Sequence, residues 1–345
     1  MGATCEHRRL RRAGEATNGP CHCENFDDTF YRQIERDLAV WRKTGVGGQV
    51  ETRMDQRLWP ESIKRAKMQI DGNRLYLVNH PSGGRARKHG RMRCALEVIL
   101  DALRHCTLPS VSFWLNVADW PLVPKKASEG PIPVLSLAKS DDYADILFPS
   151  PFLAFCAMGF EEVDMVDAGL TAFFNDYLPE ESQRVWPTLY GPRMARVPLH
   201  EHARYKYLMH VDGTTYSSRI GKLLLLDSVV LKQESPFYEF YYPPMAPYVH
   251  YIPVHRTLED LQDVYVWLSK HEADVLRVRN EAVRFADKYL TRKAARCYVV
   301  RLLHEYASLL THPSSRDGPN RVDRLEYRGT PEEQKALFET SMWSA

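Results

Sequence analysis

The sequence lacks several features that would quickly assign it to a class of protein. No apolar run approaches the roughly 20 residues that a membrane-spanning helix needs, and no apolar core follows the basic N-terminus. As written, the chain predicts neither a transmembrane anchor nor a signal peptide. The formal net charge of +2 is also small. It gives no reason to expect nucleic acid or an anionic membrane as a partner.

Motifs for two kinds of cofactor are missing as well. No G-x-G-x-x-G follows any predicted strand, which argues against a dinucleotide oxidoreductase. The triplet Cys21-His22-Cys23 has no second ligand pair at zinc-site spacing, and the alternate histidines His200 and His202 have no further placed ligand. We therefore expect no metal. The seven cysteines are an odd number, so at least one stays unpaired within a monomer.

What is present is typical of a globular protein, and 345 residues leave room for two domains. In the first half, apolar residues recur at helical spacing over residues 26–42 and 91–106, which predicts two helices. Asp71 and Gly72 lie between strand patterns over residues 67–70 and 74–78 and favour a hairpin, with a loop of two residues or more. A local basic cluster is interpreted as a solvated loop, and its members are Arg85, Arg87, Lys88, Arg91 and Arg93.

Asp119 occupies a position that invites a functional interpretation. Two apolar strands are predicted over residues 111–117 and 132–137, and Asp119 comes just after the first. The carboxyl end of a strand is where a side chain can face a cleft between domains. An aspartate in such a turn also commonly caps nearby backbone N–H groups, and the residues alone favour that interpretation.

The stretch over residues 205–254 predicts most of a nucleotide-binding half-domain. Its predicted strands cover residues 207–211, 229–232 and 249–254, with a short helix after the first. This order favours parallel pairing with right-handed crossovers. In such open sheets ligands bind beyond the carboxyl ends of the strands. Asp212, Glu234 and the turn over residues 214–219 should therefore share one crevice.

This crevice should bind an anion. Ser217 and Ser218 are N-cap candidates for the short helix, whose first N–H groups carry partial positive charge. Arg219 adds a fixed cation whose fork of N–H groups suits phosphate oxygens. The alternative is a surface ion pair between Arg219 and either Asp212 or Glu234. Spacing alone does not choose between the two.

Three runs in this stretch, in order, are YKYLMHVDGTTYSSR, SVVLKQESPFYEFYY and YVHYIPV. Together they resemble the protein O-glucosyltransferase family, glycosyltransferase family 90, which includes capsule xylosyltransferases. Two earlier runs, LNVADWP and PIPVLSLAKSDDYADILFPSPF, also resemble that family. The resemblance covers most of the globular part of the chain.

The resemblance implies an α/β fold of the GT-B-like kind. Two Rossmann-like domains would face an interdomain cleft, and a C-terminal helix would cross back to the first domain. The implied parts are a disordered N-terminus (1–20), an acceptor and catalytic-base domain (21–160), a nucleotide-sugar-binding domain (161–290), the returning helix (291–311) and a polar tail (312–345).

The implied activity is inverting transfer of glucose or xylose from a UDP-sugar. The acceptor would be a serine of a secreted protein domain or a glycan hydroxyl, in the lumen of the endoplasmic reticulum or Golgi. The UDP-sugar would be a co-substrate, with no metal or other cofactor. The family's catalytic base matches Asp119. The implied donor-binding residues are Asp212, Thr214, Thr215, Tyr216, Ser217, Ser218, Arg219 and Glu234, and the acceptor-side residues are Phe152 and Phe155.

The family also implies a disulfide between the N-terminal cysteine pair and the run ARCYVVRLLHEY. In this chain the bond would join Cys23 to Cys297. Such a bond needs an oxidising compartment.

One segment departs from the family's pattern. After FPSPF, family members carry a Phe-Arg-Gly-type motif whose arginine helps to hold the donor diphosphate, and residues 156–165 are too short to contain it. The similar text Tyr327-Arg328-Gly329 lies in the tail, out of order. Loss of such a cation costs about 1.5 to 3 kcal/mol of charge-assisted hydrogen bonding. The alternatives are a non-catalytic relative that binds nucleotide, glycan or protein, and an incomplete coding sequence.

Overall fold

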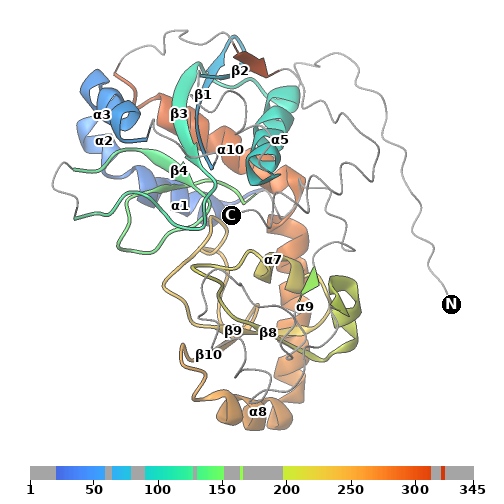
Figure 1. Cartoon of the computed structure of the whole chain (residues 1–345). Helices are drawn as coiled ribbons and strands as arrows, with labels where there is room; N and C mark the ends of the chain where they lie inside the picture. The colour runs from blue at the N-terminus through green and yellow to red at the C-terminus, as the bar shows by residue number, and fades with distance from the viewer. Residues whose placement is uncertain are drawn as a thin grey trace.

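The chain folds into a mixed α/β structure whose two main sheets lie one above the other in Figure 1. This computed structural model describes residues 21–58, 64–78, 90–126, 130–150, 164–165, 197–311 and 320–322. The upper sheet has six strands and the lower sheet has three. A separate ribbon pairs β6 (Asp164–Met165) with β7 (Val197–Pro198). The prediction of an α/β fold is confirmed.

The six-stranded sheet is mixed. Its order is β11-β2-β1-β3-β4-β5, antiparallel from β11 to β3 and parallel from β3 to β5. The strands are β1 (Arg65–Asp71), β2 (Arg74–Leu77), β3 (Val111–Asn116), β4 (Val134–Ser136), β5 (Ile146–Leu147) and β11 (Asn320–Val322). The helices of this part include α1 (Asp28–Leu38), α2 (Trp41–Thr44), α3 (Gly48–Leu58) and α5 (Gly90–His105).

Helix α1 follows from its local sequence. Asp27 caps its start, because Oδ1 accepts the Phe30 N–H at 3.2 Å. Phe30, Ile34 and Leu38 recur on one face and are fully buried. The single helix predicted over residues 26–42 is divided in the structure into α1 and α2.

The hairpin between β1 and β2 turns one residue later than predicted. Asp71 pairs with Arg74, which leaves Gly72 and Asn73 as the two turn residues. Both have positive φ, 54° and 57°, as a two-residue turn of this kind requires. Asn73 also accepts the Leu108 N–H at 2.9 Å, so the turn is anchored to the chain beyond α5.

The three-stranded sheet is parallel, as the order of its elements predicted, with β9 in the centre. Its strands are β8 (Tyr207–His210), β9 (Val229–Gln233) and β10 (Ile252–Val254). Valine, leucine and isoleucine side chains of β9 and β10 pack with Val275 and Val278 of α9. The other elements are η2 (Leu199–Arg204), α7 (Ile220–Leu223), α8 (Leu261–Lys270) and α9 (Glu272–Tyr289).

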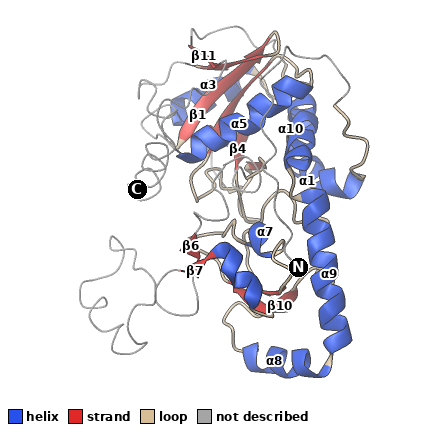
Figure 2. Cartoon of the chain, turned by 90° about the vertical axis from the view of Figure 1, so that its right-hand side faces the viewer, coloured by secondary structure: helices blue, strands red, loops and turns tan. Residues whose placement is uncertain are grey.

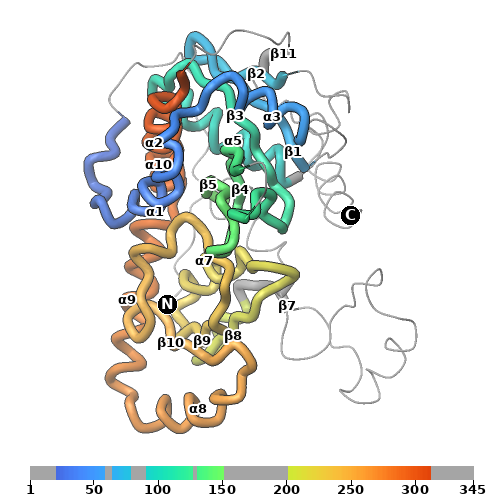
Figure 3. The backbone as a smooth tube through the Cα atoms, turned by 90° about the vertical axis from the view of Figure 1, so that its left-hand side faces the viewer, coloured from blue at the N-terminus to red at the C-terminus, as the bar shows by residue number. Residues whose placement is uncertain are grey.

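Helices and aromatic rings join the two parts. α9 lies along the lower part and α10 (Arg292–Ala307) continues into the upper part, where it packs on α1 and α5 (Figure 2). The Phe30 ring stacks on Tyr289 at a centroid distance of 5.2 Å and meets Tyr298 and Phe240 edge-on at 5.7 and 6.2 Å. These rings come from α1, α9, α10 and the segment after β9, so the two parts share one core. Figure 3 shows the backbone of α9 below and that of α10 above, beside α1.

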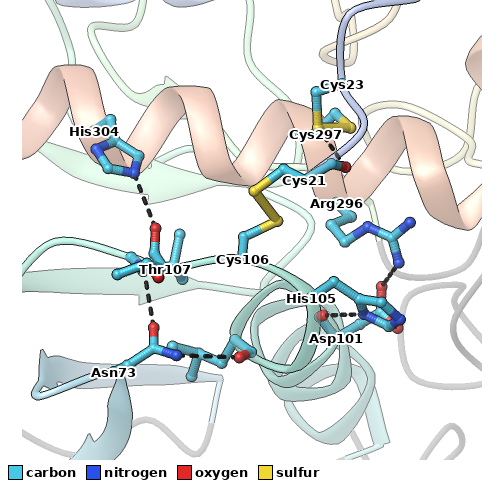
Figure 4. Close-up of a disulfide and its surroundings, with 12 residues drawn as sticks. Cys21, Cys23, Asn73, Asp101, His105, Cys106, Thr107, Arg296, Cys297 and His304 are labelled. Atoms are coloured by element: carbon cyan, nitrogen blue, oxygen red, sulfur yellow. Dashed lines mark hydrogen bonds and ion pairs between the residues drawn. A yellow bond between two sulfur atoms is a disulfide. The ribbon is translucent and has the colours of Figure 1, made fainter. Parts of the chain in front are cut away.

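Two disulfides between described cysteines tie the N-terminal segment to the upper part (Figure 4). Cys23 bonds Cys297 of α10, the pair that the resemblance implied, across a sequence separation of 274 residues. Cys21 bonds Cys106, which follows α5, and the sequence had not assigned that bond. The Cys23–Cys297 bond closes the longer loop of the two, and closing a long loop lowers the conformational entropy of the unfolded chain. This favours the folded state.

Candidate functional site

Asp119 lies in the loop after β3, and buried side chains set the shape of that loop. Asn116, which ends β3, accepts the Ala118 N–H at 3.1 Å and donates to the Trp120 carbonyl at 2.9 Å. Asp145 accepts the next two backbone N–H groups of the loop, each at 2.8 Å. Both side chains are fully buried. The loop therefore presents Asp119 in a defined position.

The Asp119 carboxylate is paired with Arg91 of α5. Nη1 of Arg91 lies 2.5 Å from Oδ1 of Asp119, and the two side chains are 30% and 38% exposed. The interpretation of Arg91 as part of a solvated loop is therefore wrong. Ion pairs this exposed add little stability, so the main consequence is the orientation of the carboxylate.

The turn over residues 211–219 reaches the same loop from the lower sheet. Thr215 is 2% exposed, and its Oγ1 donates a hydrogen bond to the Asp119 carbonyl oxygen at 2.7 Å. Thr214, beside it, is exposed. The two residues that bond are 96 positions apart. The expected base and the expected donor turn are thus neighbours in the folded chain.

His210, the last residue of β8, holds this turn from inside. Its ring is buried, and Nε2 lies 3.1 Å from the Ser217 carbonyl oxygen. Since a carbonyl only accepts, Nε2 must carry the hydrogen. Nδ1 is buried and has no hydrogen-bond partner in the described part of the chain. Burial, with Arg219 nearby, lowers the pKa of His210 to about 4, so the ring is neutral at physiological pH.

The start of α7 differs from the prediction. Arg219 is its N-cap residue, with helical backbone angles and no side-chain cap bond. The prediction that Ser217 or Ser218 would cap the helix is therefore wrong. α7 has only four residues, so few aligned peptide dipoles add up at its start. The guanidinium of Arg219 is left as the main positive group of this turn.

Arg219 makes no ion pair with Asp212 or Glu234, all three of which the structure describes. Its Nε is buried without a hydrogen-bond partner among the described residues. Burial lowers the pKa of the guanidinium. The surface ion pair considered as an alternative is therefore absent from this part of the structure, and Arg219 keeps hydrogen-bonding capacity for an anion.

Asp212 and Glu234 follow β8 and β9 at one edge of the sheet, but their surroundings differ. Asp212 accepts a hydrogen bond from the Ser235 hydroxyl, and its N–H donates to Oε1 of Gln233 at 3.0 Å. Burial raises the pKa of the Asp212 carboxyl. Glu234 is exposed and lines a cavity. The two carboxylates therefore lie at the same edge of the three-stranded sheet and have different partners.

This cavity, of about 1460 Å³, lies between the two parts of the molecule. Its walls come from α1 and α2, the loops around β4, and the segments that follow β9 and β10. Among the described residues expected at the site, only Glu234 lines it. The Phe237 ring in its wall meets Trp120 edge-on at 5.9 Å, so the Asp119 loop borders the cavity without opening into it.

Tyr216 supports the turn from behind. It is buried, and burial raises the pKa of its hydroxyl, with Glu239 adding to the effect. The phenol therefore stays protonated, and we assign Tyr216 to packing within the turn.

Some expected residues lie outside the described ones, and some important ones were not expected. Phe152, Phe155 and Tyr327-Arg328-Gly329 belong to the first group. Sequence reasoning missed the roles of Arg91 and His210. A histidine that ends an apolar strand is a signal for a buried polar role, whereas nothing in the spacing of Arg91 points to Asp119.

No helix in the described ranges combines the length and apolar character needed to cross a bilayer. In the same ranges, no three His, Cys, Asp or Glu side chains gather in a way that could hold a metal ion.

The chain is similar in sequence to several proteins that are all named protein O-glucosyltransferases. Protein O-glucosyltransferase 2 of Danio rerio is 28% identical over 341 residues, which covers 85% of this chain and 65% of the relative. Protein O-glucosyltransferase 3 of Rattus norvegicus is 29% identical over 274 residues, covering 66% and 52%. Protein O-glucosyltransferase 1 of Homo sapiens is 27% identical over 350 residues, covering 86% and 84%. The chain thus spans about half to two thirds of the length of the first two.

The sequence also matches Glycosyl transferase family 90 over residues 22–167 and 153–344. These stretches overlap at residues 153–167, around the segment that is shorter than the family's pattern. Together they span nearly the whole chain, and the resemblance seen in the sequence motifs is confirmed. The chain belongs to glycosyl transferase family 90.

Proposed function

We propose that this chain is an inverting glycosyltransferase that moves glucose or xylose from a UDP-sugar to a serine hydroxyl of a secreted protein domain or to a glycan hydroxyl. Family membership and the names of the relatives support sugar transfer to protein. The UDP-sugar is a co-substrate in this proposal, which includes no metal. The observation that carries it is the hydrogen bond from Thr215 to the Asp119 carbonyl, which joins the two candidate motifs.

Asp119 is the proposed base. Its carboxylate takes the proton from the acceptor hydroxyl while that oxygen attacks the anomeric carbon. UDP leaves from the opposite face, so the configuration at that carbon inverts. The ion pair with Arg91 and the rigid loop after β3 set the direction of the carboxylate. Orientation of this kind matters because a base must lie within hydrogen-bond reach of the proton that it removes.

Residues 214–219 are the proposed diphosphate-binding turn. Arg219 supplies the positive charge, and its unpartnered Nε favours an anion as its missing partner. His210 holds the Ser217 carbonyl, which keeps the turn in shape. In this proposal Thr214 and Ser218 provide hydroxyl groups beside the guanidinium. Stabilising the leaving diphosphate by fixed charges would replace a metal ion.

The proposal includes a GT-B-like arrangement. Residues 21–160 would carry the base and the acceptor surface with Phe152 and Phe155, and residues 161–290 would bind the nucleotide sugar. The parallel order of β8, β9 and β10 supports the second assignment. The Cys23–Cys297 disulfide supports an oxidising compartment, and we propose the lumen of the endoplasmic reticulum or Golgi.

The test is hydrolysis and transfer with UDP-glucose and UDP-xylose, using purified wild type, Asp119→Asn and Arg219→Ala. We expect Asp119→Asn to lower kcat about 100-fold or more while UDP binding is kept. Arg219→Ala should weaken UDP binding about tenfold or more. Asp263→Asn, an exposed carboxyl on α8, is the control and should match wild type. Wild-type turnover by Asp119→Asn would exclude Asp119 as the base.

A second candidate function is binding without transfer, and the Arg91–Asp119 ion pair favours it. A guanidinium that neutralises the carboxylate competes with proton transfer to it. Arg91→Gln separates the two functions: it lowers turnover if Arg91 orients the base, and it raises turnover if Arg91 blocks it. If the wild-type protein binds UDP but turns over neither UDP-glucose nor UDP-xylose, the result supports binding without transfer.

A further inference from the structure

The cavity of about 1460 Å³ has an unusual donor on its lower wall. Lys232 of β9 is 6% exposed, and its ammonium lies 5.3 Å from the Tyr242 ring centroid and 5.5 Å from that of Tyr251. Nζ donates one hydrogen bond, to the Gln233 carbonyl at 3.2 Å. Within the described residues Lys232 forms no ion pair, and the carboxylates of Asp212 and Glu234 act on it only from a longer distance. A buried ammonium can donate three hydrogen bonds, so this one has capacity left for an anion.

A second donor comes from the upper part of the molecule. Trp41, at the start of α2, lines the same cavity and is 3% exposed. Its indole Nε1 is buried and has no hydrogen-bond partner in the described part of the chain. An indole N–H can only donate. The upper part therefore supplies a buried donor without a partner, and the lower part supplies a buried ammonium that uses one of its three N–H groups.

The rest of the lining suits a polar body with flat faces. Tyr242, Tyr251 and Phe237 supply rings, and Glu234 at the edge is an exposed carboxylate that can accept from hydroxyl groups. Arg256, also exposed, adds positive charge beside the opening. The cavity exceeds the volume typical of a site for a small ligand, which is about 300 to 1,000 Å³, so its volume is sufficient for a sugar ring.

We propose that this cavity binds an anionic saccharide, a sugar that carries a carboxylate, sulfate or phosphate group. The anion pairs with Lys232, a ring oxygen or hydroxyl accepts from Trp41, and the sugar hydroxyls donate to Glu234. Burial lowers the pKa of the Lys232 ammonium, Asp212 and Glu234 partly oppose that effect, and a bound anion would oppose it further. The site is separate from the proposed diphosphate turn, because Arg219 and Thr215 do not line it. It stands whether or not the chain transfers sugar.

The experiment titrates the full disulfide-bonded chain by calorimetry and ligand-observed NMR. The probes are glucuronate, glucose 6-sulfate and glucose 6-phosphate, with glucose and inorganic sulfate as the neutral and sugar-free arms. Each titration is repeated with saturating UDP. The variants are Lys232→Met and Trp41→Phe, which keep the bulk of each side chain. Lys222→Met is the matched control, since Lys222 of α7 is another partly buried lysine and lies outside the cavity.

We expect Lys232→Met to weaken binding of the anionic sugars about tenfold or more, Trp41→Phe to weaken it a few-fold, and Lys222→Met to leave it within twofold. UDP should not displace the sugar. Displacement by UDP would place the ligand at the diphosphate turn and overturn the proposal, as would equal binding of inorganic sulfate and the sulfated sugar. Wild-type affinity in a folded Lys232→Met protein would show that Lys232 only balances nearby acidic groups. If Lys232→Met fails to fold, Trp41→Phe alone decides.

Discussion

At the scale of single residues, Glu239 is a carboxyl buried with incomplete hydrogen bonding. Its side chain is fully buried, and Oε1 accepts the Tyr241 hydroxyl at 3.0 Å. Oε2 has no hydrogen-bond partner among the described residues. Burial raises the pKa of Glu239 to about 8, so the carboxyl is protonated in the folded protein at neutral pH. Above that pH the carboxyl ionises while it is buried, which lowers the free energy of unfolding.

This burial predicts a pH dependence of stability. The unfolded chain ionises Glu239 near pH 4.5, whereas the folded chain holds the proton to about pH 8. Its contribution to stability is thus full below pH 4.5 and is lost as pH rises through 8. Glu239→Gln, which cannot ionise, should remove that loss, so its Tm relative to wild type should rise between pH 5 and pH 9. Thermal unfolding across this range measures the difference, and a constant offset would contradict it.

At the scale of elements, the turn between β8 and α7 depends on the neutral ring of His210. The bond from Nε2 to the Ser217 carbonyl joins a strand end to a segment seven residues away. α7 has only four residues, and a helix of one turn has little stability of its own. The strand therefore shapes the turn through one buried side chain.

Substitution of His210 tests this dependence. His210→Gln keeps a terminal N–H donor, while His210→Leu removes it and leaves the Ser217 carbonyl unpaired. The leucine variant should lose about 1 to 3 kcal/mol of unfolding free energy and bind UDP several-fold more weakly. The glutamine variant should recover most of both losses. Denaturant unfolding and UDP titration at pH 7 measure the two effects, and equal behaviour of both variants would argue against the hydrogen bond.

The neutral ring of His210 also gives the wild type an acid sensitivity. Burial lowers its pKa to about 4 in the folded chain, from an ordinary value of 6.5. The stability that its burial contributes is therefore full above pH 6.5 and is lost as pH falls through 4. His210→Gln should lack this loss, which unfolding measured between pH 7 and pH 4 would show.

At the scale of the whole molecule, the ring cluster around Phe30 makes the two parts one structure. Phe30 lies more than 200 positions from the other rings of the cluster and is fully buried. Phe30→Ala should cost about 3 to 5 kcal/mol of unfolding free energy. Tyr265→Ala, at an exposed ring 64% accessible, should stay within about 0.5 kcal/mol. Hydrogen exchange should show α1 and α9 losing protection together in Phe30→Ala, and loss confined to α1 would contradict the shared core.

The sequence by itself determined the elements and their class. Apolar periodicity predicts α5, a helix in the region of α1 and the buried strands, because burial of one face is a local pattern. Parallel pairing in the lower sheet followed from the order of strand and helix. The family motifs added the Cys23–Cys297 pair. Local signals were weakest at element ends, where the turn of the hairpin and the cap of α7 were each misplaced, since a cap depends on backbone angles as well as residue type.

Only the tertiary structure decided which polar groups meet. Arg91 and Asp119 are 28 positions apart, and Thr215 is 96 positions from Asp119. No spacing rule relates such residues, because the first contact depends on where α5 lies beside the loop after β3 and the second depends on how the two sheets face each other. The same holds for Lys232 and Trp41, which line one cavity only after the two parts pack. A site whose side chains come from both parts of the molecule can therefore be recognised only in the folded structure.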